Sequence, residues 1–335
     1  MRILLSSYNF YPSIGGLETT SRMLAEEFVR QGHEVTLITR TPCSVKDEFP
    51  FAVVRCPNWL QTVRSVQKCD VYLHNHLSLQ SAWPLLFFRR PWVVAIHTWI
   101  PRSGIKGFTK HFVLRYAWLI SCSNRIAAHV NYPSTVIFSP YDEGVFQVRP
   151  EFQRDKDLIF VGRLAKEKGV DTLIEALALI KAEGHEPDLT IVGGGPERDA
   201  LDRQVQERGI NEQVTFLGPK GPSEIAALMS QHRILVVPSI WEPFGIVALE
   251  GIACGCLVVG SGSAGLKDAI GPCGVTFPDG DPSALANCLA RELREPDALR
   301  NYQARALSHL QSCTRGSVAC SYLKVLHCAY ASAKS

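Results

Sequence analysis

The sequence lacks any long apolar run. A membrane-spanning helix needs about 20 consecutive apolar residues, whereas the richest segment, residues 83–96, is interrupted by two prolines and two arginines. The apolar stretch near the N-terminus, Ile3-Leu4-Leu5, ends at two serines and is too short for the core of a signal peptide. These observations predict a cytoplasmic protein.

An excess of one charge is also missing. The 35 lysines and arginines nearly balance the 32 aspartates and glutamates, which leaves a net charge of +3 over 335 residues. So small an excess gives no reason to expect a nucleic-acid partner. With 46% hydrophobic residues, the chain has enough apolar side chains for two cores, and its length predicts two domains.

Disulfide and metal patterns are not recognisable either. The 11 cysteines are odd in number and spread along a long chain, whereas disulfide frameworks belong to short secreted chains. Cys254 and Cys256 flank one glycine, but no second pair completes a zinc site. His74 and His76 fall on one face of an expected strand without an acidic partner nearby, and the Asp-Gly-Asp at 279–281 is better explained as a helix cap. We therefore predict no metal site and a metal-independent reaction.

What the sequence contains is a regular alternation of short apolar runs and helical patterns. Such repeats are typical of parallel sheets with crossover helices, so they predict an α/β fold of two doubly wound, Rossmann-like domains with a cleft between them. The polar stretch at 146–156 is the expected linker. The expected boundaries are 1–150 for the N-terminal domain, 151–312 for the C-terminal domain and 313–335 for a terminal helix.

Two cations follow the strand expected at 158–161. Arg163 and Lys168 stand between this strand and the next helix. Ligands of doubly wound sheets bind at the carboxyl ends of the strands, where two cations can hold a diphosphate. The alternative is a solvated basic loop.

Two acids stand in the segment WEPFGIVALEGIACG, at Glu242 and Glu250. At about 1.5 Å per helical residue they would lie roughly 12 Å apart, close to the span from a sugar across a diphosphate to a ribose. Each carboxylate could accept hydrogen bonds from hydroxyls, although a helix cap and a surface acid are the alternative. The free N–H groups of the helix start would bind the anion between them. They belong to Phe244, Gly245, Ile246 and Val247.

Together these motifs resemble those of the retaining GT-B glycosyltransferases of family 4, the glycosyl transferases group 1. Glu242 and Glu250 match the E-x7-E motif of that family, and residues 160–169 match its diphosphate-binding segment. Gly15 and Gly16 match its N-terminal glycine loop, and His97, at the end of the strand expected at 93–96, matches a histidine that lies beside the donor sugar. Four motifs in the right order make the resemblance specific.

The resemblance implies a nucleotide diphosphate sugar as donor and no separate cofactor. Arg163 and Lys168 would stabilise the departing diphosphate, which Gly15 and Gly16 would also touch. Glu242 would bind sugar hydroxyls, and His97 would contact the sugar near the reacting carbon. A hexose would move with retention onto a hydroxyl acceptor, a glycan or glycolipid of the cell envelope, and the terminal helix would pack back on the first domain.

The sequence also departs from the family pattern. Many relatives carry Gly-x-Pro-Glu after the strand that follows E-x7-E, whereas residues 260–267 contain no glutamate. The Gly-x-Gly-x-x-Gly at 260–265 precedes too short a helix for a dinucleotide site. A nucleotide-sugar epimerase of the same fold and a non-catalytic nucleotide-sugar-binding protein are the alternatives that we carry forward.

The segment 106–120 mixes basic and aromatic residues. It could be a surface helix resting on the inner face of a membrane, as in relatives with lipid-linked acceptors. The alternative is an ordinary crossover helix packed on the core.

Overall fold

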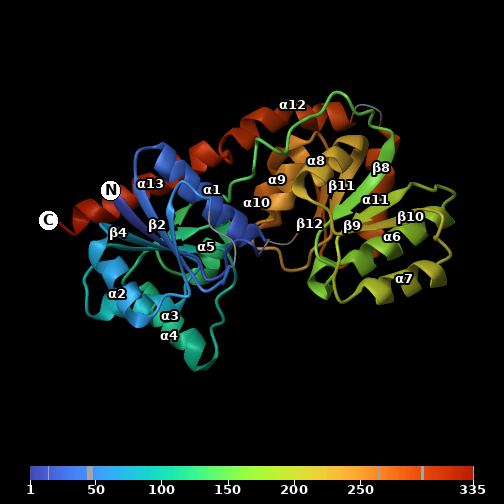
Figure 1. Cartoon of the computed structure of the whole chain (residues 1–335). Coiled ribbons are helices and arrows are strands. Elements are labelled where there is room, and N and C mark those ends of the chain that lie inside the picture. The colour runs from blue at the N-terminus through green and yellow to red at the C-terminus, as the bar shows by residue number, and fades with distance from the viewer. Residues whose placement is uncertain (14, 44–47, 263–264, 296–297, 335) are drawn as a thin grey trace. The chain divides into compact units, whose positions relative to one another are not determined.

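The computed structural model describes residues 1–13, 15–43, 48–262, 265–295 and 298–334. The chain divides into two compact units, each a parallel sheet flanked by helices (Figure 1). Unit 1 comprises Met1–Pro140 and Cys313–Ser335, and unit 2 comprises Tyr141–Ser312. The predicted α/β fold of two doubly wound units is confirmed.

The sheet of unit 1 has the strand order β3-β2-β1-β4-β5-β6-β7, with every pairing parallel. The chain moves outward from β1 toward β3 and from β4 toward β7, so the order reverses between β1 and β4. Ligands of such sheets bind beside this reversal point. The strands are β1 (Arg2–Ser6), β2 (Glu34–Thr39), β3 (Ala52–Arg55), β4 (Val71–Asn75), β5 (Trp92–Ile96), β6 (Trp118–Ser121) and β7 (Thr135–Val136).

Helices cover both faces of this sheet. On one face, α1 (Gly16–Arg30) and the C-terminal helix α13 (Arg315–Ser332) share a core with alternate residues of β1, β4 and β5. Figure 1 draws this contact between the first and the last helix of the chain. On the other face, α2 (Trp59–Lys68) packs on the remaining alternate residues. The other helices of unit 1 are α3 (Leu79–Ala82), η1 (Trp83–Leu86), α4 (Gly104–Leu114) and α5 (Asn124–Val130).

The sheet of unit 2 repeats this plan with the order β10-β9-β8-β11-β12-β13, reversed between β8 and β11. One face packs against α6, α7 and α11, and the other contacts α8, α9 and α10. Helix α12 contacts α9 and β12, and its Leu299 and Tyr302 pack against the core of the first face. The strands are β8 (Lys156–Val161), β9 (Leu189–Val192), β10 (Val214–Gly218), β11 (His232–Val237), β12 (Leu257–Ser261) and β13 (Gly274–Phe277). The helices are η2 (Lys166–Lys168), α6 (Val170–Ala182), α7 (Arg198–Glu207), α8 (Pro222–Gln231), α9 (Ile246–Ala253), α10 (Leu266–Ile270), η3 (Gly271–Cys273), α11 (Pro282–Arg294) and α12 (Ala298–Gln311).

Some sequence boundaries need correction. Residues 141–150, expected in the first domain, belong to unit 2 because they reach the end of α9: Val148 lies beside Gly255, and Arg149 acts electrostatically on Cys254. The single helix expected over 106–120 ends at Leu114, and Trp118–Ser121 is the strand β6.

Two further findings concern the helices. Helix α2 was not predicted from the sequence, although Asn58 and Gln61 form a capping box at its start. In the described part of the chain, no helix combines the length and the apolar content needed to cross a bilayer.

Candidate functional site

The carboxyl edge of the unit 2 sheet is built from loops that touch through their backbones. The Leu164 N–H donates to the Gly194 carbonyl at 3.0 Å, which joins the loop after β8 to the loop after β9. A Cβ on Gly193, whose φ is +138°, would lie 1.8 Å from the Gly162 carbonyl oxygen. Only glycine allows this approach, so the loop that carries Arg163 has a fixed path.

The same β8 loop is joined to the loop after β11. Gly169 has a φ of +66°, and a Cβ there would lie 2.1 Å from the Pro238 carbonyl oxygen. The Ile240 N–H donates to the Glu167 carbonyl at 2.9 Å. Because β8 and β11 are neighbours at the reversal point, these contacts bring Lys168 to the loop that carries Glu242.

Lys168 and Glu242 form an ion pair at this point. The Lys168 Nζ donates to the Glu242 Oε2 at 2.6 Å, and both side chains are partly buried. Arg163 is exposed, and no hydrogen bond or ion pair of its side chain occurs among the described residues. Lys166, in the same turn as Lys168, is also exposed and has no ion pair among the described residues, so Arg163 and Lys166 are open cations beside the paired Lys168.

Helix α9 begins beside this ion pair, but later than the sequence suggests. Its first residue is Ile246, and its N-cap is Gly245 in the left-handed region at φ +93°. The expected start at Phe244 is therefore wrong. Phe244 is buried, and the left-handed turn that the chain makes at Gly245 delays the helix.

Because α9 begins at Ile246, fewer of its N–H groups are available to an anion than the sequence predicts. The first N–H groups of a helix have no partner within it, which here leaves those of Ile246 and Val247, because the Ala248 N–H already donates to the Gly245 carbonyl at 2.9 Å. A Cβ on Gly245 would lie 3.2 Å from the Glu242 Cγ. Glu242 thus lies against the N-terminus of α9.

Glu250 lies further along α9, where Ala248, Leu249 and Ile252 around it are all buried. Burial raises the pKa of Glu250 to about 7, and the Asp142 carboxylate adds to this. A half-buried carboxylate of this kind is stabilised in its charged form when hydroxyl groups donate hydrogen bonds to it. The structure does not support the alternative of an ordinary surface acid.

In unit 1, His97 follows β5 and is buried. Its Nε2 lies 2.6 Å from the Oδ1 of Asn75, the last residue of β4. The Asn75 Nδ2 donates to the Ser21 Oγ at 2.6 Å and to the Leu17 carbonyl at 3.3 Å, so the Asn75 oxygen must accept from His97. Ser7, directly after β1, continues the network because its Oγ lies 2.8 Å from the Ser21 Oγ.

Burial keeps the imidazole neutral, and the network determines which of its nitrogens carries the proton. Burial lowers the pKa of His97 to about 3, and His76 contributes further. The ring is therefore neutral, with its proton on Nε2 and a lone pair on Nδ1. His97 can then accept a hydrogen bond from a hydroxyl through Nδ1.

The glycine loop of unit 1 leads into α1. Gly15 is the N-cap of that helix, and its carbonyl accepts the Thr19 N–H at 3.0 Å. Gly16 is the first helical residue, so its N–H is among the groups without a partner inside the helix. Ile14, part of the same motif, lies outside the described residues.

The pair His74 and His76 does not form a metal site. The Trp92 Nε1–H donates to the His74 Nδ1 at 2.7 Å, and the His74 Nε2 lies 3.0 Å from the Ser81 Oγ. Both nitrogens of His74 are thus occupied. No group of three or more histidines, cysteines or acids within the described residues could hold a metal ion.

Sequence reasoning missed Asn75, which only the neighbouring positions of β4 and β5 bring to His97. A signal was present, because the polar residues His74, Asn75 and His76 directly follow the apolar residues that begin β4. Polar residues at the carboxyl end of a parallel strand are candidates for ligand contacts.

Two doubly wound units, with polar loops at the carboxyl edge of each sheet, define the GT-B class. Family models agree: residues 14–134 match Glycosyltransferase Family 4, and residues 143–309 match Glycosyl transferases group 1. The chain belongs to the GT-B glycosyltransferases of family 4.

Individual relatives span nearly the whole chain. The glycogen synthase of Mycobacterium tuberculosis is 28% identical over 93% of this chain and 91% of its own length. The sucrose-phosphate synthase of Thermosynechococcus elongatus superposes with a TM-score of 0.81, 23% identity and 99% coverage of both chains. HepE of Anabaena, in a complex with UDP and glucose, superposes with a TM-score of 0.80 and 21% identity over 98% of this chain and 99% of its own.

Proposed function

We propose that this glycosyltransferase moves a hexose, with retention of anomeric configuration, from a nucleoside diphosphate sugar to a hydroxyl group of an acceptor. The observation that carries the proposal is the Lys168–Glu242 ion pair against the N-terminus of α9. It combines a cation for the diphosphate, free amides for an anion and a carboxylate for sugar hydroxyls. The complexes of HepE with UDP and with UDP-glucose support a donor of this type.

In the proposed reaction, the bond between the anomeric carbon and the diphosphate oxygen breaks, and its electron pair leaves with the diphosphate. Arg163, Lys168 and the amides of Ile246 and Val247 stabilise the charge that develops on the leaving group. The acceptor oxygen bonds to the same face of the anomeric carbon, and its proton passes to the departing phosphate oxygen. The chain's own cations serve in place of a metal ion, and no cofactor besides the donor takes part.

The remaining predicted residues have supporting roles. Glu250 accepts hydrogen bonds from the ribose, which relieves the cost of its burial. In unit 1, neutral His97 contacts the donor sugar through Nδ1, and the amides after Gly15 and Gly16 contact the diphosphate. An epimerase would need both a general acid and a general base beside the sugar, whereas His97, whose Nε2–H donates to Asn75, offers only the lone pair of its Nδ1.

The experiment is an incubation with UDP-, GDP- and ADP-hexoses. Release of nucleoside diphosphate, with the product anomer assigned by NMR, supports transfer. An epimerised sugar or binding without turnover would support one of the two alternatives instead. If no nucleotide sugar binds or turns over, the proposal fails.

We further propose that the acceptor is a cell-envelope glycan or glycolipid and that the protein rests on the inner face of the membrane through residues 106–120. Helix α4 exposes several large apolar side chains, with Ile105 88% exposed, Phe108 73% and Phe112 47%, although its last residue, Leu114, is buried. Their spacing places these three exposed side chains on one side of the helix. Tyr116, also exposed, follows the end of the helix, and its ring lies 5.7 Å from that of Phe112.

The net positive charge of the sequence around α4 supports contact with an anionic membrane. Residues 71–141 contain no aspartate or glutamate but seven lysines and arginines. Exposed aromatic and aliphatic side chains among basic residues are suited to an anionic lipid interface.

Sedimentation with vesicles tests this contact. Phosphatidylcholine vesicles that contain phosphatidylglycerol should bind the protein, and pure phosphatidylcholine vesicles should bind it weakly. Replacing Phe108 and Phe112 by serine should abolish binding, while Leu307→Ser, at an exposed apolar position of unit 2, should not. Equal sedimentation of both variants would contradict the contact.

A further inference from the structure

His76 lies at the carboxyl end of β4, one of the two strands between which the order of the unit 1 sheet reverses. It directly follows Asn75, the last residue of that strand. Its backbone N–H donates to the Ala95 carbonyl of β5 at 3.0 Å, which fixes His76 beside the strand that leads to His97. Because ligands of doubly wound sheets bind beside the reversal point, His76 stands where a ligand contact is expected.

The backbone of His76 is strained. Its φ is +78°, in the left-handed region, and among the described residues other than glycine only Cys56 and Asn131 share a positive φ. A side chain crowds the backbone in this region, which destabilises it relative to glycine. Asn131 ends helix α5, where the conformation is common, but His76 ends a strand. Strained residues of this kind cluster at ligand-binding sites.

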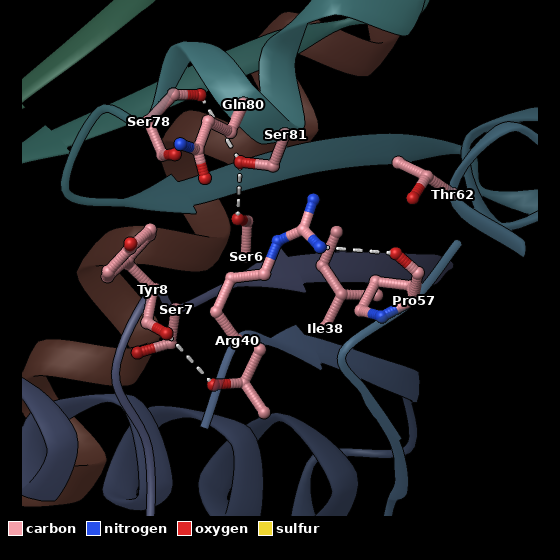
Figure 2. A pocket seen from close by; sticks show the side chains of 11 residues that line it. Ser6, Ser7, Tyr8, Ile38, Arg40, Pro57, Thr62, Ser78, Gln80 and Ser81 are labelled. Carbon is pink, nitrogen blue, oxygen red and sulfur yellow. Dashed lines mark hydrogen bonds between the residues drawn. The ribbon is translucent and has the colours of Figure 1, made fainter. Parts of the chain in front are cut away.

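The segment after His76 holds this conformation in place. Residues 77–82 lead into and through α3, and the Ser6 Oγ–H, at the end of β1, donates to the Ser81 Oγ at 2.9 Å (Figure 2). The His74 Nε2 lies 3.0 Å from the same oxygen. The chain is thus anchored before His76 by β4 and after it by Ser81, so the strain cannot relax locally.

The imidazole of His76 makes no hydrogen bond with any part of the chain that the structure describes. Its Nδ1 is enclosed and has no partner, whereas its Nε2 is not enclosed. A neutral imidazole carries one N–H donor and one acceptor, and a buried polar atom that stays unpaired destabilises the fold. The ligand-free protein therefore gains no hydrogen bond from a side chain whose backbone is strained.

The surroundings of the ring keep it uncharged. Burial lowers the pKa of His76 to about 4, and the Lys110 ammonium group of α4 contributes. His76 in turn contributes to the low pKa of His97, so the two imidazoles are close enough to interact. A neutral ring with one donor and one acceptor matches a hydroxyl group, which also has both, whereas a phosphate would favour the protonated ring.

We propose that His76 is a second sugar-binding residue of unit 1, and that its Nε2 forms a hydrogen bond with a hydroxyl group of the donor hexose, next to the contact of His97. This inference rests on the proposed function, which supplies the nucleoside diphosphate sugar. The left-handed backbone and the unpaired Nδ1 are then the cost of presenting Nε2 at the carboxyl edge of the sheet.

Calorimetric titration separates the contribution of the hexose from that of the nucleotide. The ligands are the nucleotide sugar that binds most tightly among the UDP-, GDP- and ADP-hexoses, and the corresponding nucleoside diphosphate. His76→Phe keeps an aromatic ring and removes both nitrogens. It should weaken binding of the nucleotide sugar about threefold to tenfold, as expected for the loss of one hydrogen bond, and leave binding of the nucleoside diphosphate within about twofold of wild type.

Melting temperatures test whether the ring instead supports the fold. His76→Phe should melt at or above the wild type, because carbon replaces an unpaired buried nitrogen. His76→Gly removes the backbone strain as well and should also lose the hexose contribution, which covers the case that phenylalanine does not fit. Asn131→Gly changes the same backbone conformation at an exposed position and is the control, with wild-type binding of both ligands.

The outcomes separate this inference from the proposed function. If both His76 variants bind the nucleotide sugar like the wild type, or lose affinity equally for both ligands, the role of His76 is overturned and the proposed function stands. A melting temperature of His76→Phe well below the wild type would assign the ring to the fold and overturn the role too. If no nucleotide sugar binds the wild type, the proposed function fails and this inference fails with it.

Discussion

The carboxyl edges of the two sheets follow the same topology but carry opposite chemistry. In unit 2, the reversal point holds charged groups, with the Lys168–Glu242 ion pair and the raised pKa of Glu250. In unit 1, it holds neutral groups, with the hydrogen-bonded pair His97 and Asn75. One plan of strand and loop thus supports two kinds of site, because the topology places the loop ends and the side chains decide what can bind.

The largest effect is expected from removing a charge of unit 2. Lys168→Ala should lower the turnover number by about 100-fold, because the leaving diphosphate loses a preorganised cation. Steady-state release of nucleoside diphosphate measures this. Lys166→Ala, an exposed lysine of the same 3-10 turn, is the matched control and should stay within about twofold of wild type. Equal losses in both variants would deny Lys168 a specific role.

A smaller effect is expected from the partner carboxylate. Glu242→Ala should lower turnover by about tenfold or more, since the sugar loses a hydrogen-bond acceptor and Lys168 loses its ion pair. Glu175→Ala removes an exposed ion pair with Arg208 on the helices of the same unit and is the control. Near wild-type rates for Glu242→Ala in a folded protein would refute its assignment.

Adding a charge to the site of unit 1 should remove the difference between the two units. Asn75→Asp sets a carboxylate beside the His97 Nε2 and should raise the pKa of His97 from about 3 toward neutrality. As the pH falls through the new pKa, the imidazolium forms, its Nδ1 lone pair is lost, and kcat/KM should drop several-fold.

Over pH 6 to 8, the wild type should show no such limb from His97, because its imidazole stays neutral there. Asn75→Leu removes the hydrogen bond without adding a charge and should be slower with no new pH dependence. Parallel pH profiles for Asn75→Asp and the wild type would mean that a carboxylate at position 75 does not raise the pKa of His97 into this range.

The smallest effect concerns the stability of unit 2 without ligand. The folded pKa of Glu250 is about 7 and its ordinary value is 4.5. Between these values the folded state binds more protons than the unfolded state, so stability falls as the pH rises through this window. Glu250→Gln should therefore melt near the wild type at pH 4.5 and above it at pH 8, by about 2 to 4 °C for each kcal/mol of removed penalty.

Differential scanning fluorimetry at the two pH values measures this difference. Addition of the nucleoside diphosphate should reverse the order at pH 8, because the wild-type carboxylate then gains ribose hydroxyls. A difference that is the same at both pH values would show that burial does not perturb Glu250.

Much of the fold could be predicted from the sequence. The strands expected at 93–96 and 158–161 are found as β5 and β8, which begin one and two residues earlier, because short apolar runs between turn residues are local signals. The start of α9 could not be predicted, since no local signal shows that Gly245 adopts a φ of +93° and has no room for a Cβ beside Leu266. The exposure of α4 could not be predicted either, because its residues suit both a membrane surface and a protein core.

The sequence by itself determined the alternation of strands and helices, the two-domain plan, and the types of side chain at the strand ends. These depend on periodicity and turn chemistry, which act over a few residues. Only the tertiary structure decided which of those side chains meet. Parallel pairing makes neighbours of β4 and β5 and of β8 and β11, which brings Asn75 to His97 and Lys168 to Glu242 across 22 and 74 residues of chain. It also decided their electrostatics, because burial, which lowers the pKa of His97 and raises that of Glu250, arises only when distant segments pack together.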